Sequence, residues 1–288
     1  MRSAQEMYAL ILETAQNDER IRAVILNGSR ANPNARRDIF QDFDVVYVVT
    51  EVASFKNDPD WIKCFGELMI RQLPDEMDDP PPEGKHSYAY LMQFADGNRI
   101  DLTLFPLEKL DQMERDSLSV LWLDKDGLIE PFPPANESDY LPRPPTAKAF
   151  ADCCNEFWWV SPYVAKGLWR GEILYAKYMF DIVREQLIKM LVWQIGSQTQ
   201  FAVSPGKFGK HFKRYLAAEQ WNLLLAIYAD ADYERTWDAL EAMGQLFRAA
   251  ALFVAAHSGF EYPHQDDDRV TAHLQHVRVL PKDAREMY

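Results

Sequence analysis

The chain has 288 residues, of which 48% are hydrophobic, and its 31 basic and 44 acidic residues give a net charge of −13. This length and hydrophobic content provide a sizeable core in one large domain or two modest ones, and they exclude general disorder. The acidic balance argues against a nucleic-acid partner, which needs a concentrated basic surface, and is compatible with a cationic small substrate. On charge alone, an ordinary acidic cytoplasmic protein is the simpler interpretation.

The cysteines and the apolar segments bear on the compartment in which the protein works. The three cysteines, Cys64, Cys153 and Cys154, have neither metal-binding spacing nor a disulfide pattern, and such a low, odd count fits a reducing compartment. The first residues lack a secretory signal, and no apolar stretch approaches the roughly 20 residues needed to cross a bilayer. We therefore expect a cytoplasmic protein with no membrane partner.

The N-terminal half alternates helical and strand-like patterns. Residues 2–16 have the apolar spacing of an amphipathic helix, and residues 59–73 show a second helical stripe. Apolar runs typical of strands follow along this half, at residues 21–27, 44–49, 87–94, 99–105 and 120–127. An Asp-Gly pair at 96–97, between the third and fourth runs, predicts a hairpin. Residues 75–85, with three consecutive prolines, are expected to be irregular.

The second half has a different composition. Residues 131–145 contain six prolines around a polar middle, which is typical of an extended linker. Helical spacing predominates after it, most clearly over 170–196 and 233–257. The sequence therefore predicts an α+β protein, with a mixed sheet flanked by helices at 1–135, a linker at 136–145 and a helical-bundle domain at 146–288.

Two aspartates open the second apolar run. Asp42 and Asp44 are at positions i and i+2, so in a strand their carboxylates lie on one face and repel each other unless a cation lies between them. Such oxygen ligands suit Mg²⁺, which completes its shell with phosphate oxygens and water. Asp101 is a third carboxylate, inside a later strand-like run, on the face that it shares with Arg99 and Thr103. For that strand alone, a solvated face is the simpler interpretation.

A glycine–serine pair ends the first strand-like run. Gly28 permits close approach of the backbone to a ligand, and free N–H groups at such a turn bind phosphate well. Ser29 adds a hydroxyl donor, and Arg30 adds a guanidinium suited to phosphate oxygens. A Gly-Ser pair alone carries no information. It becomes far more specific when a short loop, an Asp-x-Asp pair at a second strand and a third aspartate in a later strand follow it.

With Gly28-Ser29, Asp42-x-Asp44 and Asp101 in this order, the chain resembles the DNA polymerase beta-type nucleotidyltransferases. The segments NGSRAN, FQDFDVVYVV, RIDLTLF, NEFWWV and GKFGKHFKRYL are similar to those of the aminoglycoside 6-adenylyltransferases, the streptomycin-modifying enzymes. This resemblance extends through nearly the whole chain. It implies transfer of AMP from ATP to a hydroxyl of an aminoglycoside, at the 6-position of streptomycin, with release of pyrophosphate.

The resemblance also implies roles for these residues. The Gly-Ser turn would hold the terminal phosphates of ATP, and Asp42 and Asp44 would hold Mg²⁺ on those phosphates. Asp101 would lie near the attacking hydroxyl, either as general base or as ligand of a second metal, because a hydroxyl is a poor nucleophile without one of these activations. The sequence leaves the choice open.

In the helical half, Glu156 lies beside Phe157, Trp158 and Trp159. A carboxylate among large aromatic rings suits a polycationic sugar, through ion pairing and cation–π contact. Without the resemblance, core aromatics beside a solvated glutamate are the simpler interpretation. With it, we predict that Glu156 and Trp159 contact the drug.

Three lysines of the helical half are candidates for contacts with the triphosphate. Lys177 could reach a phosphate, or could instead pair with Asp181 at i+4. Lys207 and Lys210 belong to the basic segment 204–216, which we expect at a helix start, where basic residues oppose the helix dipole unless an anion is bound. A solvated helix face is the alternative for this segment.

Two other classes of function fit the same motifs. One is a nucleotidyltransferase that modifies a protein or an RNA, which the low pI and the large helical half disfavour. The other is a non-catalytic binding module, which the intact aspartates and Gly-Ser pair disfavour. We expect a monomer and leave a homodimer open.

Overall fold

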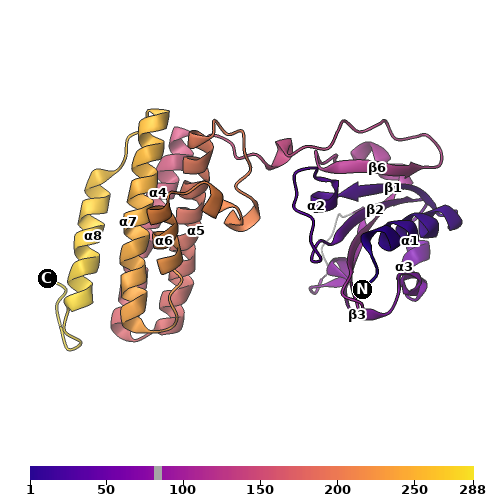
Figure 1. Ribbon diagram of the computed structural model, residues 1–288. Coiled ribbons are helices and arrows are strands. Elements are labelled where there is room, and N and C mark those ends of the chain that lie inside the picture. The colour runs from indigo at the N-terminus through magenta and orange to yellow at the C-terminus, as the bar shows by residue number, and fades with distance from the viewer. Residues whose placement is uncertain (81–85) are drawn as a thin grey trace. The chain divides into compact units, whose positions relative to one another are not determined.

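The computed structural model, which describes residues 1–80 and 86–288, forms two compact units, Met1–Asp139 and Tyr140–Tyr288 (Figure 1). The first unit contains the β-sheet, and the second is helical. The boundary between the units falls inside the proline-rich segment of the sequence. The α+β class expected from the sequence is confirmed, whereas the division of functions between two domains and a linker stays a prediction.

The first unit is built around a six-stranded mixed sheet with the order β3-β4-β5-β2-β1-β6. Neighbouring strands are antiparallel except for β2 and β5, which are parallel. The strands are β1 (Ile21–Asn27), β2 (Phe43–Val49), β3 (Leu68–Gln72), β4 (Tyr88–Phe94), β5 (Arg99–Pro106) and β6 (Ser119–Asp124). All five strand-like runs of the sequence correspond to strands of this sheet.

Helix α1 (Ala4–Asn17) covers one face of the sheet (Figure 1). It begins with a capping box, in which the Glu6 N–H donates to the Ser3 hydroxyl and the Ser3 N–H donates to the Glu6 carboxylate. Its inward face is fully buried, and the Tyr47 hydroxyl of β2 donates to the Ile11 carbonyl at 2.6 Å. Because side chains alternate along a strand, the neighbours of Tyr47 in β2 point to the opposite face.

The predicted hairpin is confirmed, with the Asp-Gly pair at 96–97 in the turn between β4 and β5. Burial alternates along β5, so that its aliphatic residues face the core and Asp101 and Thr103 lie on the other face. Two further helices of this unit are short, α2 (Gly28–Ala31) and α3 (Ala53–Lys56).

The helix predicted over residues 59–73 is wrong. Trp61–Phe65 forms one short 3₁₀ segment, and Leu68–Gln72 is the edge strand β3, which pairs with β4. Gly66 separates the two with a φ of 124°, a conformation that L-residues rarely adopt. Pairing with β4 overrides the local helical pattern. In the segment 75–85, which the sequence predicts to be irregular, residues 81–85 lie outside the described residues.

The second unit is a bundle of helices. They are α4 (Ala147–Arg170), α5 (Ile173–Gln198), α6 (Ala218–Ala226), α7 (Tyr233–Ser258) and α8 (His264–Val279). The helices predicted over 170–196 and 233–257 are confirmed as α5 and α7. The start of α4 is capped by the Thr146 hydroxyl, which accepts a hydrogen bond from the Ala149 N–H at 3.1 Å.

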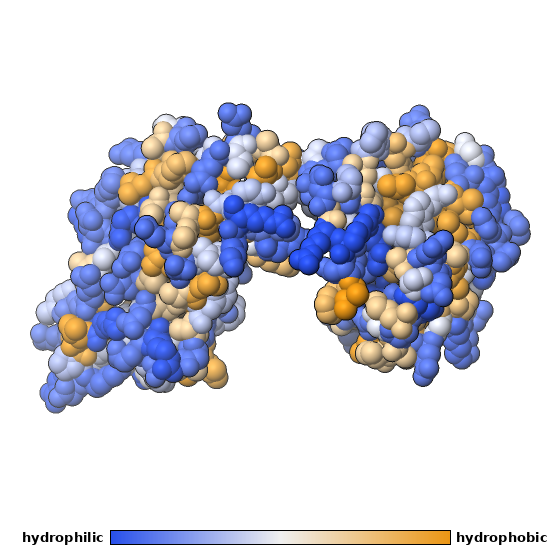
Figure 2. Space-filling view, viewed as in Figure 1, coloured by the Kyte–Doolittle hydropathy of each residue, from blue (hydrophilic) through white to orange (hydrophobic). Residues whose placement is uncertain are grey.

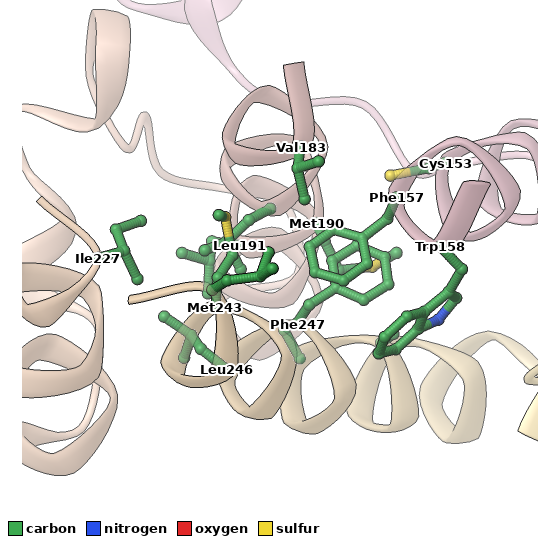
Figure 3. Packing of buried hydrophobic residues seen from close by; sticks show 14 of the residues in the cluster. Cys153, Phe157, Trp158, Val183, Met190, Leu191, Ile227, Met243, Leu246 and Phe247 are labelled. Carbon is green, nitrogen blue, oxygen red and sulfur yellow. The ribbon is translucent and has the colours of Figure 1, made fainter. Parts of the chain in front are cut away.

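Large side chains of α4, α5 and α7 interdigitate in the core of this bundle (Figure 3). Phe157 of α4 stacks on Phe247 of α7, with ring centroids 3.7 Å apart and planes 9° apart. Trp158 meets Phe247 edge-on, at 6.0 Å. Such aromatic pairs each contribute about 0.5–1.5 kcal/mol beyond the burial of their area. Two aromatic residues of the NEFWWV segment are therefore part of the core.

Helix α7 is long and apolar enough to cross a membrane by length and composition, contrary to the expectation that no stretch would qualify. Half of the most apolar 18-residue stretch of this helix is buried inside the helical unit, where α7 packs against α5 and α4. On the face shown in Figure 2, hydrophobic patches are separated by hydrophilic residues. A core position in the bundle accounts for the apolar composition of α7.

Candidate active site

A row of polar side chains crosses the sheet on the face opposite to α1. The strand register pairs Asp101 of β5 with Asp44 of β2, Asp44 with Asn27 of β1, and Asn27 with Ser119 of β6. Residues paired in this way point to the same side of a sheet. The Ser119 hydroxyl donates to the Asn27 side-chain oxygen at 2.8 Å. Sequence reasoning missed Asn27 and Ser119, because only the register reveals that they continue the row.

Asp42 completes a cluster of three carboxylates. It precedes Asp44 by two residues, and one ligand oxygen from each of Asp42, Asp44 and Asp101 lies within 4.8 Å of the others. In the part of the chain that the structure describes, no other group of three or more acidic, histidine or cysteine side chains meets this criterion. The three aspartates that the sequence singled out are therefore brought together, in an arrangement that could hold a divalent cation.

The electrostatics of Asp44 fit such an ion. Burial, followed by the negative charges of Asp42 and Asp101, raises the pKa of Asp44 to about 7. The charges of Arg99 and Arg30 oppose this shift without cancelling it. A carboxyl group with this pKa is only partly charged near neutral pH. A cation among the three oxygens would favour the charged form, so the donor set and its charge both suit a metal.

Gly28 follows Asn27 in the sequence and lies against the Asp44 carboxylate. Its φ is 69°, and a Cβ atom placed on it would lie 2.2 Å from Oδ2 of Asp44. Any larger residue would therefore displace the carboxylate, in addition to straining the backbone. The next residue, Ser29, lies near the Gln41 side-chain amide, which donates to its carbonyl and hydroxyl oxygens at 3.3 Å each. The Gly-Ser turn and the aspartates thus form one site.

Arg30 is buried, with 9% of its surface exposed. Its Nε donates to the Asp42 carbonyl at 2.9 Å and its Nη2 to the Gln41 carbonyl at 2.6 Å. The guanidinium also lies over the Phe43 ring, 3.6 Å from its centroid. This geometry favours a role in fastening the segment that carries Asp42. Contact of Arg30 with phosphate stays a prediction.

Arg99 is a third residue whose part in the site was not predicted from the sequence. Its guanidinium forms a two-pronged contact with Asp101, from Nε to Oδ1 and from Nη2 to Oδ2, at 2.7 Å each. It also approaches Asp42, with 3.9 Å between Nε and Oδ2. The i and i+2 spacing of Arg99 and Asp101 already placed both on one face of the strand, but the sequence did not predict that they pair.

In the helical unit, Glu156 and Trp159 lie one helical turn apart on the exposed side of α4. Trp159 is 62% exposed, which is unusual for so large an aromatic side chain. Its ring meets that of Tyr163 edge-on, with centroids 6.4 Å apart. The structure thus separates these two residues from the core aromatics next to them and places them together on the surface of α4.

The three lysines lie on two segments of the helical unit, Lys177 in α5 and the other two in the basic segment 204–216. The Lys177 Nζ donates to the Ala229 carbonyl at 3.0 Å, while Asp181 pairs with Arg184. Burial lowers the pKa of Lys177. The helix start expected for 204–216 is wrong, because this segment forms only two short 3₁₀ turns, Lys207–Gly209 and Phe212–Arg214. Gly206 and Gly209 have positive φ, which interrupts a helix. Phosphate contacts of the lysines stay predictions.

Comparison with known proteins relates this chain to a family. The model of the streptomycin adenylyltransferase family matches residues 1–277. The aminoglycoside 6-adenylyltransferase of Bacillus subtilis (strain 168) is 42% identical over 270 residues, which cover 93% of this chain and 95% of that protein. The aminoglycoside 6-adenylyltransferase of Campylobacter jejuni is 43% identical over 269 residues, which cover 93% of both chains. The protein in a crystal structure of an aminoglycoside 6-adenyltransferase from Bacillus subtilis is 38% identical in sequence to this chain. The match covers 97% of this chain and 100% of that one, with a TM-score of 0.48. This chain therefore belongs to the streptomycin adenylyltransferase family.

Proposed function

We propose that this protein transfers AMP from ATP to a hydroxyl group of an aminoglycoside, the 6-hydroxyl of streptomycin, with release of pyrophosphate. The observation that carries the proposal is the cluster of Asp42, Asp44 and Asp101 beside Gly28. The names of the relatives supply the class of acceptor. Transfer of AMP to the drug would inactivate it, so the expected biological result is antibiotic resistance.

Asp42, Asp44 and Asp101 would hold Mg²⁺, since carboxylate oxygens at this spacing are the ligands that it prefers. When bound, the ion would neutralise charge that develops on the phosphates and on the leaving pyrophosphate. Gly28 contributes by having no side chain, which leaves room for the Asp44 carboxylate. The Ser29 hydroxyl is available as a donor to the terminal phosphates.

Asp101 would serve the attacking hydroxyl. It lies in the row beside Asp44 and is 20% exposed, so a ligand can reach its carboxylate from solvent. As a base it would accept the proton of the hydroxyl as the oxygen attacks the α-phosphorus, and as a second cation ligand it would favour the deprotonated hydroxyl. Titration of Mn²⁺ into the wild type and Asp101→Asn in the presence of a nucleotide separates the two roles, because only the loss of a second cation ligand reduces the number of ions bound.

The acceptor would bind at the exposed side of α4 in the helical unit. Glu156 offers a carboxylate to a cationic sugar, and the exposed ring of Trp159 offers a face for cation–π contact. Lys177, Lys207 and Lys210 would contact the triphosphate of ATP, and Arg30 would support the phosphate side of the site. The net charge of −13 assists capture of a polycationic drug over longer distances. We place the reaction in the cytoplasm, in a monomer.

Pyrophosphate release tests the proposal, with purified protein, ATP, Mg²⁺ and a panel of aminoglycosides that includes streptomycin. We expect release that depends on both the drug and the cation. Folded protein that releases none with any drug would contradict the proposal. Labelled ATP added to a cell extract tests the alternative acceptor, because label on protein or RNA rather than on added streptomycin would favour an AMP transferase with a macromolecular substrate.

A further inference from the structure

The Arg99 guanidinium forms an ion pair with the Asp101 carboxylate. Its two hydrogen bonds reach both carboxylate oxygens, at 2.7 Å each. This two-pronged geometry is the strongest contact that an arginine makes with a carboxylate, and it fixes the orientation of both groups. The same guanidinium approaches Asp42, so it brings one positive charge against two members of the cluster.

A cation at the cluster has to use the same carboxylate. The ligand oxygens of the three aspartates lie within 4.8 Å of one another. A divalent ion held among them would therefore stand close to the guanidinium that now contacts two of them. Like charges at such a separation repel each other, and each weakens the hold of the other on Asp101.

The contact is exposed enough to exchange. The Arg99 side chain is 45% exposed and that of Asp101 is 20% exposed. Ion pairs with this much access to water contribute little net stability, because water solvates the separated charges well. Both residues lie on one strand, at i and i+2, so rotation of the arginine side chain alone is sufficient to release Asp101.

We propose that Arg99 is an internal counterion that holds Asp101 in the metal-free protein and competes with the divalent cation for this carboxylate. The inference rests on the proposed function, since it takes the three aspartates as the cation site. Arg99 is therefore a positioning residue, which acts on the reaction through Asp101. It keeps Asp101 in the row beside Asp44 and sets how tightly the cation binds.

Calorimetric titration of the nucleotide-free protein with Mn²⁺ tests the proposal. Arg99→Gln removes the competing charge, and we expect the Kd for Mn²⁺ to fall by about three- to tenfold. Arg99→Lys keeps the charge but loses the two-pronged contact, so its Kd lies between those of the wild type and Arg99→Gln. In an Asp101→Asn background, the same arginine substitution produces a smaller change, because the contested carboxylate is gone.

Arg22→Gln is the matched control. Arg22 makes the same two-pronged contact with Asp126 at the other end of β1, so its loss changes the net charge equally, away from the cluster. We expect its Kd for Mn²⁺ to equal that of the wild type. A folded Arg99→Gln protein, verified by thermal melting, that binds Mn²⁺ no more tightly than the wild type overturns the proposal. Measurement of the Kd for Mn²⁺ needs no turnover. If Arg99→Gln binds Mn²⁺ more tightly than the wild type, but the wild type transfers no AMP, the result counts against the proposed function alone.

Discussion

Each unit contains a carboxylate that is largely withdrawn from water, and the two have opposite surroundings. Asp267 of α8, only 2% exposed, accepts hydrogen bonds of 2.5–3.0 Å from Arg248, Tyr262 and Thr271. Burial by itself raises its pKa, but these donors outweigh burial and leave the pKa below its ordinary value. The hydrogen-bonding capacity of the Asp267 carboxylate is therefore met by the protein, and its ion pair with Arg248 links α8 to α7.

Asp44 has the opposite balance. Burial and two negatively charged neighbours, Asp42 and Asp101, raise its pKa to about 7. Asp267 has three donors, whereas none of the residues that the structure describes donates a hydrogen bond to the Asp44 carboxylate. Folding stability favours the first arrangement, whereas the second is retained at a cost. Asp267 therefore serves the fold, whereas the surroundings of Asp44 support its proposed role as a ligand of a cation.

The largest expected effect follows from removing the charge of Asp44. Asp44→Asn should lower kcat for drug-dependent pyrophosphate release by about a thousandfold or more, equivalent to at least about 4 kcal/mol of barrier. Steady-state kinetics with streptomycin measures this. The variant should melt no earlier than the wild type in metal-free buffer, because it loses an unfavourable charge. An Asp44→Asn protein with wild-type turnover would refute the metal role.

The reverse pattern is expected for Asp267. Asp267→Asn leaves the Arg248 guanidinium without its charged partner, and should cost about 3 kcal/mol of unfolding free energy. Urea unfolding measures the loss. Turnover of the folded protein at low temperature should stay within about twofold of the wild type. Asp268→Asn, on the exposed side of the same helix, is the control and should change stability by less than about 0.5 kcal/mol.

Alanine substitutions at two glycines with similar backbone conformations distinguish the effect of backbone strain from the effect of displacing the Asp44 carboxylate. Gly28 and Gly127 have φ of 69° and 65°, but only at Gly28 would a Cβ meet another heavy atom within 4 Å. Substitution by alanine should cost each protein about 1 kcal/mol of stability through backbone strain. Only Gly28→Ala should also lower kcat, by about ten- to a hundredfold, since it moves the Asp44 carboxylate. Equal activities of the two variants would remove Gly28 from the site.

The smallest effect concerns an exposed carboxylate. Glu156→Gln should raise the KM for streptomycin by about three- to tenfold and leave the KM for ATP unchanged, because it removes one solvated ion pair with the drug. Glu185→Gln, an exposed glutamate of α5, makes the same charge change as a control. If both variants keep the wild-type KM for streptomycin, Glu156 does not contact the drug.

Part of this picture could be predicted from local pattern alone. The hairpin, five strands and the shared face of Asp42 and Asp44 follow from spacing, because alternation in a strand is a local property. That Asp101 adjoins Asp44 depends on the parallel pairing of β2 with β5, a contact between distant segments. The sequence pattern identified the residues, and the register brings them together.

The errors have related causes. The helix predicted over 59–73 loses to pairing of β3 with β4, which is invisible locally. The basic segment 204–216 looks like a helix start, but positive φ at Gly206 and Gly209 divides it into short turns. In each case, contacts made by the folded chain outweigh a local preference.

The stability of the metal-free protein as a function of pH bears on the central claim, that a cation completes the surroundings of Asp44. The folded pKa of about 7 lies above the ordinary value. The folded state therefore binds the extra proton between about pH 4 and pH 7, and stability falls as pH rises through this window. Asp267, with its lowered pKa, contributes the opposite slope, a loss of stability as pH falls below about 4.

The most direct measurement is urea unfolding of the wild type and of Asp44→Asn at pH 8, with and without saturating Mn²⁺. Without the cation, Asp44→Asn should be the more stable protein by about 2–4 kcal/mol, and the difference should vanish near pH 4. Saturating Mn²⁺ should stabilise the wild type and reduce or reverse this difference, because it binds only the intact cluster tightly. A wild type that is already the more stable protein without cation, or equal stabilisation of both proteins by Mn²⁺, would contradict the account.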